Sequence, residues 1–259
     1  MARRTLALVA VVVCVSSLAG AQVLYDGSAG GTPDAQGWLY RTLPLGGASA
    51  LNGAAGGVTT LDTTAVRTDY AGWFSEFLPS GRHPLMPALD RAAGYVVRFD
   101  LQVLAEGHDV RDIDGDLVDD RAGFSVIALS SDGQGIELGF WADEVLAYDY
   151  RTVGAGEEFI HDETSSGFRP DAAMTRYELW VTGPAYTLKA GGAAVLSGAL
   201  RDYSGGGEPY TTPSFLFFGD DSGSADSRAA LSYIDVIPEP ASLCLLAAGA
   251  AALLRRRRR

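Results

Sequence analysis

The stretch GYVVRFDLQVL, Gly94–Leu104, decides the fold class of this chain. Apolar and polar side chains alternate along it: Val97, Phe99, Leu101 and Val103 against Arg98, Asp100 and Gln102. A period of two residues is typical of a β-strand with one buried and one solvated face. The stretch therefore predicts a strand that covers one side of a core.

Further strand-like runs recur at short spacing, and no stretch keeps a helical period for ten residues. The runs are Ala122–Ser131, Gly135–Trp141, Thr175–Thr182, Ala185–Ala190, Ser214–Gly219 and Arg228–Ile237. Glycine-containing turns such as Asp132–Gly133, Ala190–Gly192 and Gly205–Gly207 interrupt the chain and favour hairpins or loops. Antiparallel sheets must bury one face, so we expect an all-β fold, a two-sheet antiparallel β-sandwich of jelly-roll type. Residues 27–57, rich in Gly, Ala and Pro, are expected to form loops around a short strand near Trp38–Leu43.

The N-terminus has the three-part order of a signal peptide. Two arginines precede the apolar run Leu6–Val15, and small residues follow it up to Ala19 and Ala21. The run is shorter than the roughly 20 apolar residues of a membrane span. We predict a signal helix in residues 1–21 with cleavage after Ala21, and a sandwich domain in residues 22–237.

The C-terminus, residues 238–259, combines a prolyl break, an apolar segment and a basic end. Pro238, Glu239 and Pro240 precede the apolar stretch Ala241–Leu254, and the chain closes with Arg255–Arg259. A helix of this stretch is about 21 Å long, shorter than the roughly 30 Å hydrocarbon core, although arginines can snorkel. Arginine clusters stay on the cytoplasmic side, so the body is expected outside the inner membrane.

This tail resembles the PEP-CTERM sorting signal of bacterial envelope proteins. The resemblance implies an exosortase-type processing enzyme as a partner that cuts near Pro238, Glu239 and Pro240. A cell-wall sortase signal lacks its LPxTG box here, and a disordered basic tail does not account for the apolar stretch. An uncut membrane anchor remains as an alternative. Either way we expect an exported protein at the cell envelope or extracellular surface, held at the inner membrane before any processing.

The predicted body is acidic and has no cysteine. Two arginines lie in the signal and five in the tail, which leaves 13 basic residues, and without Glu239 there are 31 acidic ones, for a formal charge of −18. Cys14 and Cys244 both lie in the terminal segments. The body thus has no disulfide or thiolate metal site, and its charge disfavours nucleic acid as a partner.

A candidate calcium loop lies in RDIDGDLVDDR, residues 111–121. Asp112, Asp114, Asp116 and Asp120 occupy positions 1, 3, 5 and 9 of a loop, where carboxylates can surround one calcium ion. Position 6 is Leu117 where EF-hand loops have glycine, and position 12 is Gly123 where they have glutamate. An acidic solvated turn explains the pattern equally well. A second acidic turn, Asp220–Ser224, is expected to cap its own backbone and is free to meet the first loop in space.

Enzyme signatures are missing: there is no His-x-x-x-His pair, no Gly-x-Ser-x-Gly elbow and no Gly-x-Gly-x-x-Gly turn. Glu137 and Glu178 stand alone between apolar neighbours, without the Glu-x-Asp-x-Glu strand of related glucanases. We therefore expect no enzyme. A divergent glycoside hydrolase, with two carboxylates paired across strands, remains the alternative.

Sugar binding is the preferred function from the sequence. If Ile136 and Leu138 face the core, Glu137 and Trp141 face outward, and the same argument places Glu178 and Trp180 outside. Flat aromatic rings beside carboxylates can bind the sugar rings of polysaccharides. Both faces of a sandwich strand can also be covered, which would make these tryptophans core residues.

The order of strands resembles the concanavalin A-like lectin and glucanase sandwich, above all in FLFFGDDSGSA, residues 215–225. Together with residues 26–40 and 121–141, this segment is similar to a bacterial exported family, the choice-of-anchor domain, type Y. The resemblance implies an anchored extracellular module with no catalytic residues. We expect a non-catalytic structural, adhesive or matrix module that binds glycans with the help of calcium.

Overall fold

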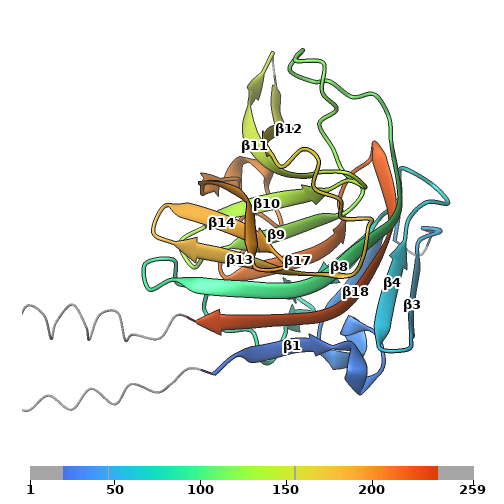
Figure 1. Ribbon diagram of the computed structural model, residues 1–259, viewed down its shortest axis with the longest axis vertical. Coiled ribbons are helices and arrows are strands. Elements are labelled where there is room, and N and C mark those ends of the chain that lie inside the picture. Colours follow the sequence, from blue (N-terminus) through green and yellow to red (C-terminus); the bar gives the residue numbers. More distant parts are fainter. Residues whose placement is uncertain (1–19, 46, 155, 239–259) are drawn as a thin grey trace, which may run out of the picture. The chain divides into compact units, whose positions relative to one another are not determined.

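Strand β8, Tyr95–His108, contains the alternating stretch and pairs with strands on both of its sides. The computed structural model describes residues 20–45, 47–154 and 156–238 (Figure 1). The four predicted core residues of β8 are fully buried, and its polar residues are only partly buried. The predicted signal and C-terminal helices lie outside the described residues. Within the described residues, no helix has the length and apolar character needed to cross a membrane.

Sheet A has eight strands in the order β15-β14-β13-β8-β18-β4-β3, with β1 beside β18. All of its strand pairs are antiparallel. The other bounds are β1 Gln22–Asp26, β3 Leu51–Ala55, β4 Val58–Asp62, β13 Thr175–Thr182, β14 Ala185–Ala190, β15 Ala193–Ala199 and β18 Ala225–Pro238. The first and last strands lie side by side, with Gln22 opposite Val236.

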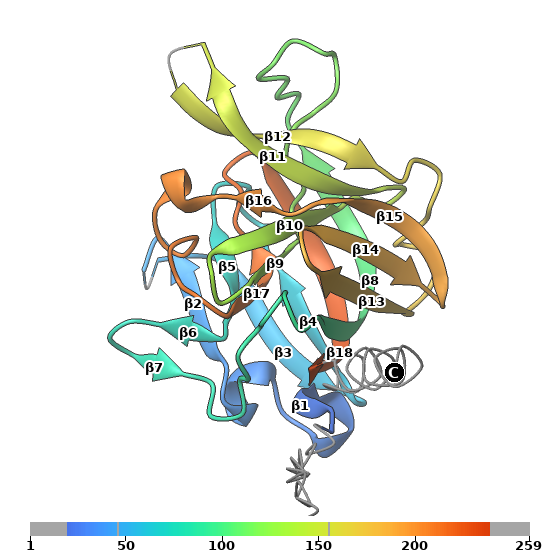
Figure 2. The ribbon, with the colours of Figure 1, turned by 90° about the vertical axis from the view of Figure 1, so that its left-hand side faces the viewer.

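Sheet B also has eight strands, in the order β12-β11-β10-β9-β17-β5-β2, with β16 beside β10. Its pairs are antiparallel as well. The bounds are β2 Leu39–Leu43, β5 Tyr70–Phe74, β9 Ser125–Leu129, β10 Gln134–Phe140, β11 Val145–Val153, β12 Gly156–Thr164, β16 Arg201–Asp202 and β17 Phe215–Asp220. A separate hairpin of β6, Glu76–Phe77, and β7, Gly81–Arg82, projects at one side (Figure 2). Three short 3-10 helices complete the described part: Gly27–Ala29, Pro33–Gln36 and Ser204–Gly206.

The two sheets pack face to face around one aromatic core. Phe99 of sheet A meets Phe140 and Phe218 of sheet B edge-on, at centroid distances of 6.0 and 5.3 Å. Such tilted contacts are favoured between aromatic rings. The predicted fold class, a two-sheet antiparallel β-sandwich, is confirmed.

Each of the seven predicted runs is a strand in the structure, and Asp132–Gly133 joins β9 and β10. The expectation of loops in most of residues 27–57 is wrong at its end, because Leu51–Ala55 forms strand β3. Its residues are largely exposed, and its ladder with β4 holds it in place. A strand of small, exposed residues has no alternation for a sequence to show.

Part of the outer face of sheet B is buried too. A second apolar cluster covers it, formed by Ile127, Leu129, Tyr203, Tyr210, Phe215 and Phe217. The segment between β16 and β17 supplies the two tyrosines. Strands β9, β10 and β17 are therefore buried on both faces, while the outer face over β2 and β5 stays open.

Candidate functional site

A groove of about 690 Å³ lies on the outer face of sheet B. Its base is formed by β2, β5 and β17, which Figure 2 shows beside the β6–β7 hairpin. Residues of β12 and of three loops, 111–121, 208–212 and 220–224, complete its walls. The volume is within the range of small-molecule sites, which are typically about 300–1,000 Å³.

Exposed apolar side chains are concentrated along this groove. Five of them line it, with exposed fractions between 38% and 75%: Leu43, Leu45, Tyr70, Phe77 and Leu78. The buried ring of Phe217 and the partly buried ring of Phe74, 4.8 Å apart, form the surface beneath. Gly72 makes room for this arrangement, because a Cβ there would lie 2.3 Å from the Phe217 ring. The groove thus offers flat apolar surfaces to a ligand.

A buried cluster of charged groups lies at the base of the groove. The Nη2 atom of Arg121 is 3.1 Å from Oε1 of Glu137 and 2.9 Å from Oδ1 of Asp221. The Tyr210 hydroxyl donates to Glu137 at 2.7 Å and lies 3.3 Å from Asp221. One guanidinium and one phenol therefore bridge two carboxyl groups. Arg121, Tyr210 and Asp221 line the groove, whereas Glu137 lies beneath them with no exposed surface.

The cluster is neutral only when one of its carboxyl groups keeps a proton. Burial, together with the charge of Asp221, raises the pKa of Glu137 to about 8 against the attraction of Arg121. The two carboxylates raise the pKa of Arg121 well above its ordinary value although burial opposes this, so the guanidinium stays charged. Its Nη1 atom has no hydrogen-bond partner among the described residues. At neutral pH the Glu137 carboxyl group is therefore mainly protonated.

Two aromatic rings pack against the guanidinium of Arg121. The Cζ atom of Arg121 lies 4.3 Å from the ring centroid of Tyr148 and 5.2 Å from that of Phe159. Cation–π contacts of this kind strengthen when the groups are desolvated. Arg121 is thereby fixed in place, and a ligand in the groove meets a preformed donor group.

The second acidic turn adjoins this cluster and meets the first loop, as the sequence left open. Ser222 donates its backbone N–H to Asp220, as expected for a turn that caps its own backbone. Arg121, the last residue of the first loop, meets Asp221 of the turn at 2.9 Å. Asp220 itself is buried, and burial raises its pKa well above the ordinary value.

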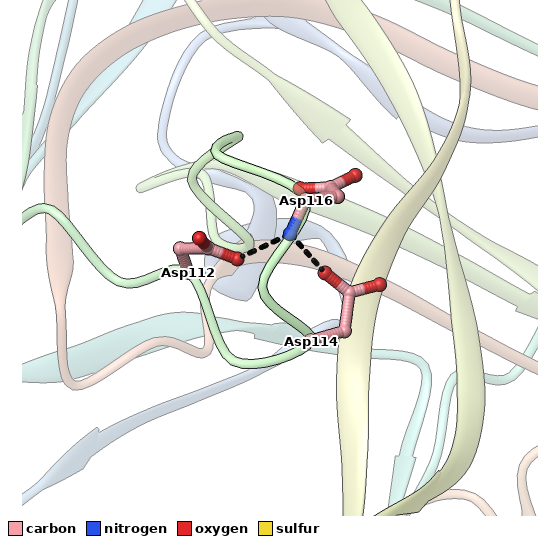
Figure 3. A group of neighbouring side chains, drawn as sticks. All are labelled: Asp112, Asp114 and Asp116. Atoms are coloured by element: carbon pink, nitrogen blue, oxygen red, sulfur yellow. Dashed lines mark hydrogen bonds between the residues drawn. The ribbon is translucent and has the colours of Figure 1, made fainter.

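Three of the four predicted calcium ligands lie together (Figure 3). Asp112, Asp114 and Asp116 each offer a carboxylate oxygen, all within 4.8 Å of one another. Leu117 adopts a φ of 72°, so the loop makes the sharp turn even without the glycine of an EF-hand loop. Asp112 accepts the backbone N–H groups of the turn, and Asp114 forms an ion pair with Arg151.

Asp120 does not join the other three carboxylates. It is 1% exposed, and its two oxygens accept the backbone N–H groups of Ile113 and His161. The prediction of Asp120 as a calcium ligand conflicts with this role as an anchor of the loop. Sequence spacing could not distinguish a carboxylate that points into the loop from one that points into the protein.

The predicted sugar-binding residues are divided between two surfaces. Glu137 does leave the main core, as predicted, but it is fully buried, and Trp141 is only 7% exposed between the rings of His108 and His161. The outward orientation of this pair therefore does not make it solvent-accessible, and for Trp141 the alternative given above, a core residue, holds.

Glu178 and Trp180 lie on the outer face of sheet A and are partly exposed. The Trp180 indole donates to Glu178, and Lys189 lies 4.2 Å from its ring centroid. The two pairs cannot form one site, because they belong to different sheets. The aromatic residues of the groove, Tyr70 and Phe77, were not predicted, since they lie in strands without clear alternation.

Comparison with known proteins identifies the C-terminal segment. A family model described as the PEP-CTERM protein-sorting motif matches residues 236–259. This motif indicates an exported protein that is sorted to the envelope. It begins within β18, whose last residue, Pro238, is paired with Tyr95. A search of curated proteins finds no match to the chain.

Solved structures share the sandwich. A carbohydrate esterase from Shiga toxin-encoding bacteriophage phi24B has a TM-score of 0.52 at 15% identity, over 84% of this chain and 98% of its own. A Bacillus subtilis protein with a galectin-like fold has a TM-score of 0.46 at 9% identity, over 83% and 96% of the two chains. At such identities the likeness concerns the fold alone.

Proposed function

We propose that this exported protein is a non-catalytic, envelope-anchored module that binds a polysaccharide in the groove on sheet B. One observation carries the proposal: the exposed apolar residues converge on the groove that also holds the Arg121 cluster. Binding sites typically combine an apolar lining with a few fixed polar groups. Flat rings can stack on the apolar faces of sugars, while Arg121 and Asp221 offer partners to hydroxyl groups.

Replacing Phe77 by alanine is expected to weaken glycan binding by about threefold to eightfold. The side chain is 40% exposed in the groove, so its loss removes ligand contact without opening the core. Fully covering such a ring contributes about 1.5–3 kcal/mol, so covering the exposed 40% contributes about 0.6–1.2 kcal/mol, which is less than the 1.4 kcal/mol of a tenfold change. A glycan array followed by calorimetry on the retained sugar measures the effect.

Trp180→Ala is the matched control for this experiment. It removes a partly exposed aromatic ring from the outer face of sheet A and should leave binding unchanged. If Trp180→Ala weakens binding and Phe77→Ala does not, the site is on sheet A and the groove is not the binding surface.

A glycoside hydrolase is the second candidate, because Glu137 and Asp221 contact the same guanidinium nitrogen. Hydrolases need two carboxyl groups about 5–9 Å apart. Binding is favoured over hydrolysis since Glu137 is fully covered and does not line the groove. Release of reducing ends from a bound glycan, lost in Asp221→Asn, would establish hydrolysis instead.

Calcium at the Asp112, Asp114 and Asp116 loop is the second part of the proposal. We expect millimolar calcium to raise the melting temperature, with an affinity in the 10⁻⁴–10⁻³ M range of extracellular modules. Asp114→Ala should remove the effect, and Asp143→Ala, which changes an exposed acid outside the loop, should keep it. Equal melting temperatures of the wild type with calcium and with chelator would refute calcium binding.

The proposed anchoring has a direct test at the two ends of the mature chain. We expect mass spectrometry of the envelope fraction to find Gln22 as the first residue and a C-terminus near Pro238, Glu239 and Pro240. An envelope protein that still carries Arg259 would support the uncut membrane anchor. Recovery of the intact chain from the cytosol, with both ends uncut, contradicts export.

A further inference from the structure

The groove that we propose as a glycan site contains ionisable groups of both signs. Three arginines and five acids line it: Arg41, Arg111 and Arg121, and Glu76, Glu158, Glu208, Asp220 and Asp221. The charge of a ligand that fits there depends on how many of these groups are already paired. The ion pairs and hydrogen bonds of the described residues that line the groove show which groups are paired.

Two of the arginines already have carboxylate partners. Arg121 contacts Asp221 and Glu137, and Arg111 lies 3.5 Å from Glu158. On the acidic side, Glu76 forms an ion pair with Arg82 at 2.9 Å. These pairs leave no surplus of positive charge in their part of the groove.

Arg41 differs, because no carboxylate lies within ion-pair distance of it among the described residues. Its guanidinium donates to the carbonyl of Tyr40 and to the hydroxyl of Ser80, and it lies 5.3 Å from the Phe77 ring centroid. Glu208 balances it as an acid whose contacts are the hydroxyls of Thr211 and Thr212. One unpaired cation, Arg41, thus remains on the groove, together with two acids that have no cation partner in the described part of the chain, Glu208 and the buried Asp220.

The surroundings of the groove add a negative field. The body from Gln22 to Ile237 has a formal charge of −18, since it keeps 13 basic and 31 acidic residues once the terminal segments are removed. A polyanion needs clustered unpaired cations to overcome such a field, and a single arginine does not provide them. Hydroxyl groups need no countercharge, and they can donate to carboxylates and accept from Arg121.

We infer that the groove accepts uncharged polysaccharides and excludes polyanionic ones, an inference that rests on the function proposed above. The contacts for a neutral chain are apolar surfaces from Phe77 and Leu78 and hydrogen bonds with Arg121 and Asp221. Uronic acids and sulfated sugars would place several negative charges beside Glu208 and Asp221, and of the described residues that line the groove Arg41 alone would be available to them as an unpaired cation.

Affinity electrophoresis of the full chain in gels with dissolved polymers tests the inference. One set contains neutral polymers, such as xylan, a β-glucan and a galactomannan, and the other contains alginate, pectate and a sulfated galactan. We expect at least one neutral polymer to retard the wild type, and every polyanion to bind at least tenfold more weakly. Retardation by the neutral polymer should be weaker in Phe77→Ala and insensitive to added salt.

Other outcomes of this experiment would contradict the inference. Retardation by a polyanion that salt weakens and Arg41→Gln removes would overturn the inference. If Phe77→Ala also weakens that retardation, the groove remains the binding site and only the assignment of neutral ligands fails. If no polymer in either set retards the wild type, glycan binding itself fails and the inference fails with it.

Discussion

Arg121→Met is expected to destabilise the fold by about 3 kcal/mol, because it removes one partner of a buried ion pair. The guanidinium is 9% exposed and contacts Glu137 and Asp221 as well as the rings of Tyr148 and Phe159. Methionine keeps the apolar contacts but leaves Asp221 facing Glu137 without a cation. Chemical denaturation at neutral pH measures the loss as a lower midpoint.

Arg176→Met is the matched control. Arg176 forms an ion pair with Asp100 on the outer face of sheet A, with 44% of its side chain exposed. An exposed pair of this kind contributes about 0–1 kcal/mol. If both variants lose the same stability, the Arg121 cluster is no more than a surface ion pair.

The double variant Arg121→Met with Asp221→Asn separates the ion pair from its surroundings. Replacing both partners of a buried pair is often close to neutral, whereas breaking it is costly. We therefore expect the double variant to recover part of the stability that Arg121→Met loses. A double-mutant cycle with no coupling between the two positions would show that they do not interact.

The strands could be predicted from the sequence where one face of the strand is exposed to solvent or where the run of residues is strongly apolar. The alternation of β8 places Val97 and Phe99 in the core, as found. Strand β3 could not be found, because hydrogen bonds to β4 hold its exposed small residues. The register and the order of strands depend on contacts between distant segments, such as Gln22 with Val236, which local patterns do not contain.

The groove could not be predicted from the sequence, because residues that are distant in the chain form it. Glu137 and the acidic turn at Asp221 both stand out in the sequence, but 84 positions separate them in the numbering of the chain. Only the ladders β10-β9-β17 bring them to the same Arg121 side chain. An isolated glutamate between Ile136 and Leu138 indicates a strand with a polar outer position. The residues that cover this glutamate, Tyr203 and Tyr210, come from a segment whose path no local sequence pattern shows.

The pH dependence of stability is the second large effect we expect, and Glu137 sets its sign. Its pKa is about 8 in the folded chain and 4.5 by its ordinary value, so folding takes up a proton between these two pH values. Where the folded state binds more protons, the free energy of unfolding falls as pH rises. The stabilisation that Glu137 contributes is therefore fully present below pH 4.5 and is lost as the pH rises toward 8. Over this range the free energy of unfolding falls by at most about 1.4 kcal/mol per pH unit.

Glu137→Gln isolates this contribution from the other titrating groups. Asp220 has a raised pKa and acts in the same direction, whereas the hydrogen bond from His161 helps to lower the pKa of Glu144, which acts in the opposite direction. Subtracting the free energy of unfolding of Glu137→Gln from that of the wild type at each pH removes the contributions of Asp220 and Glu144. We expect the wild type to lose stability relative to Glu137→Gln between pH 5 and 8, in denaturation series at one-unit steps. Parallel curves would mean that Glu137 is already ionised at pH 5, and hence that the attraction of Arg121 outweighs burial in the folded protein.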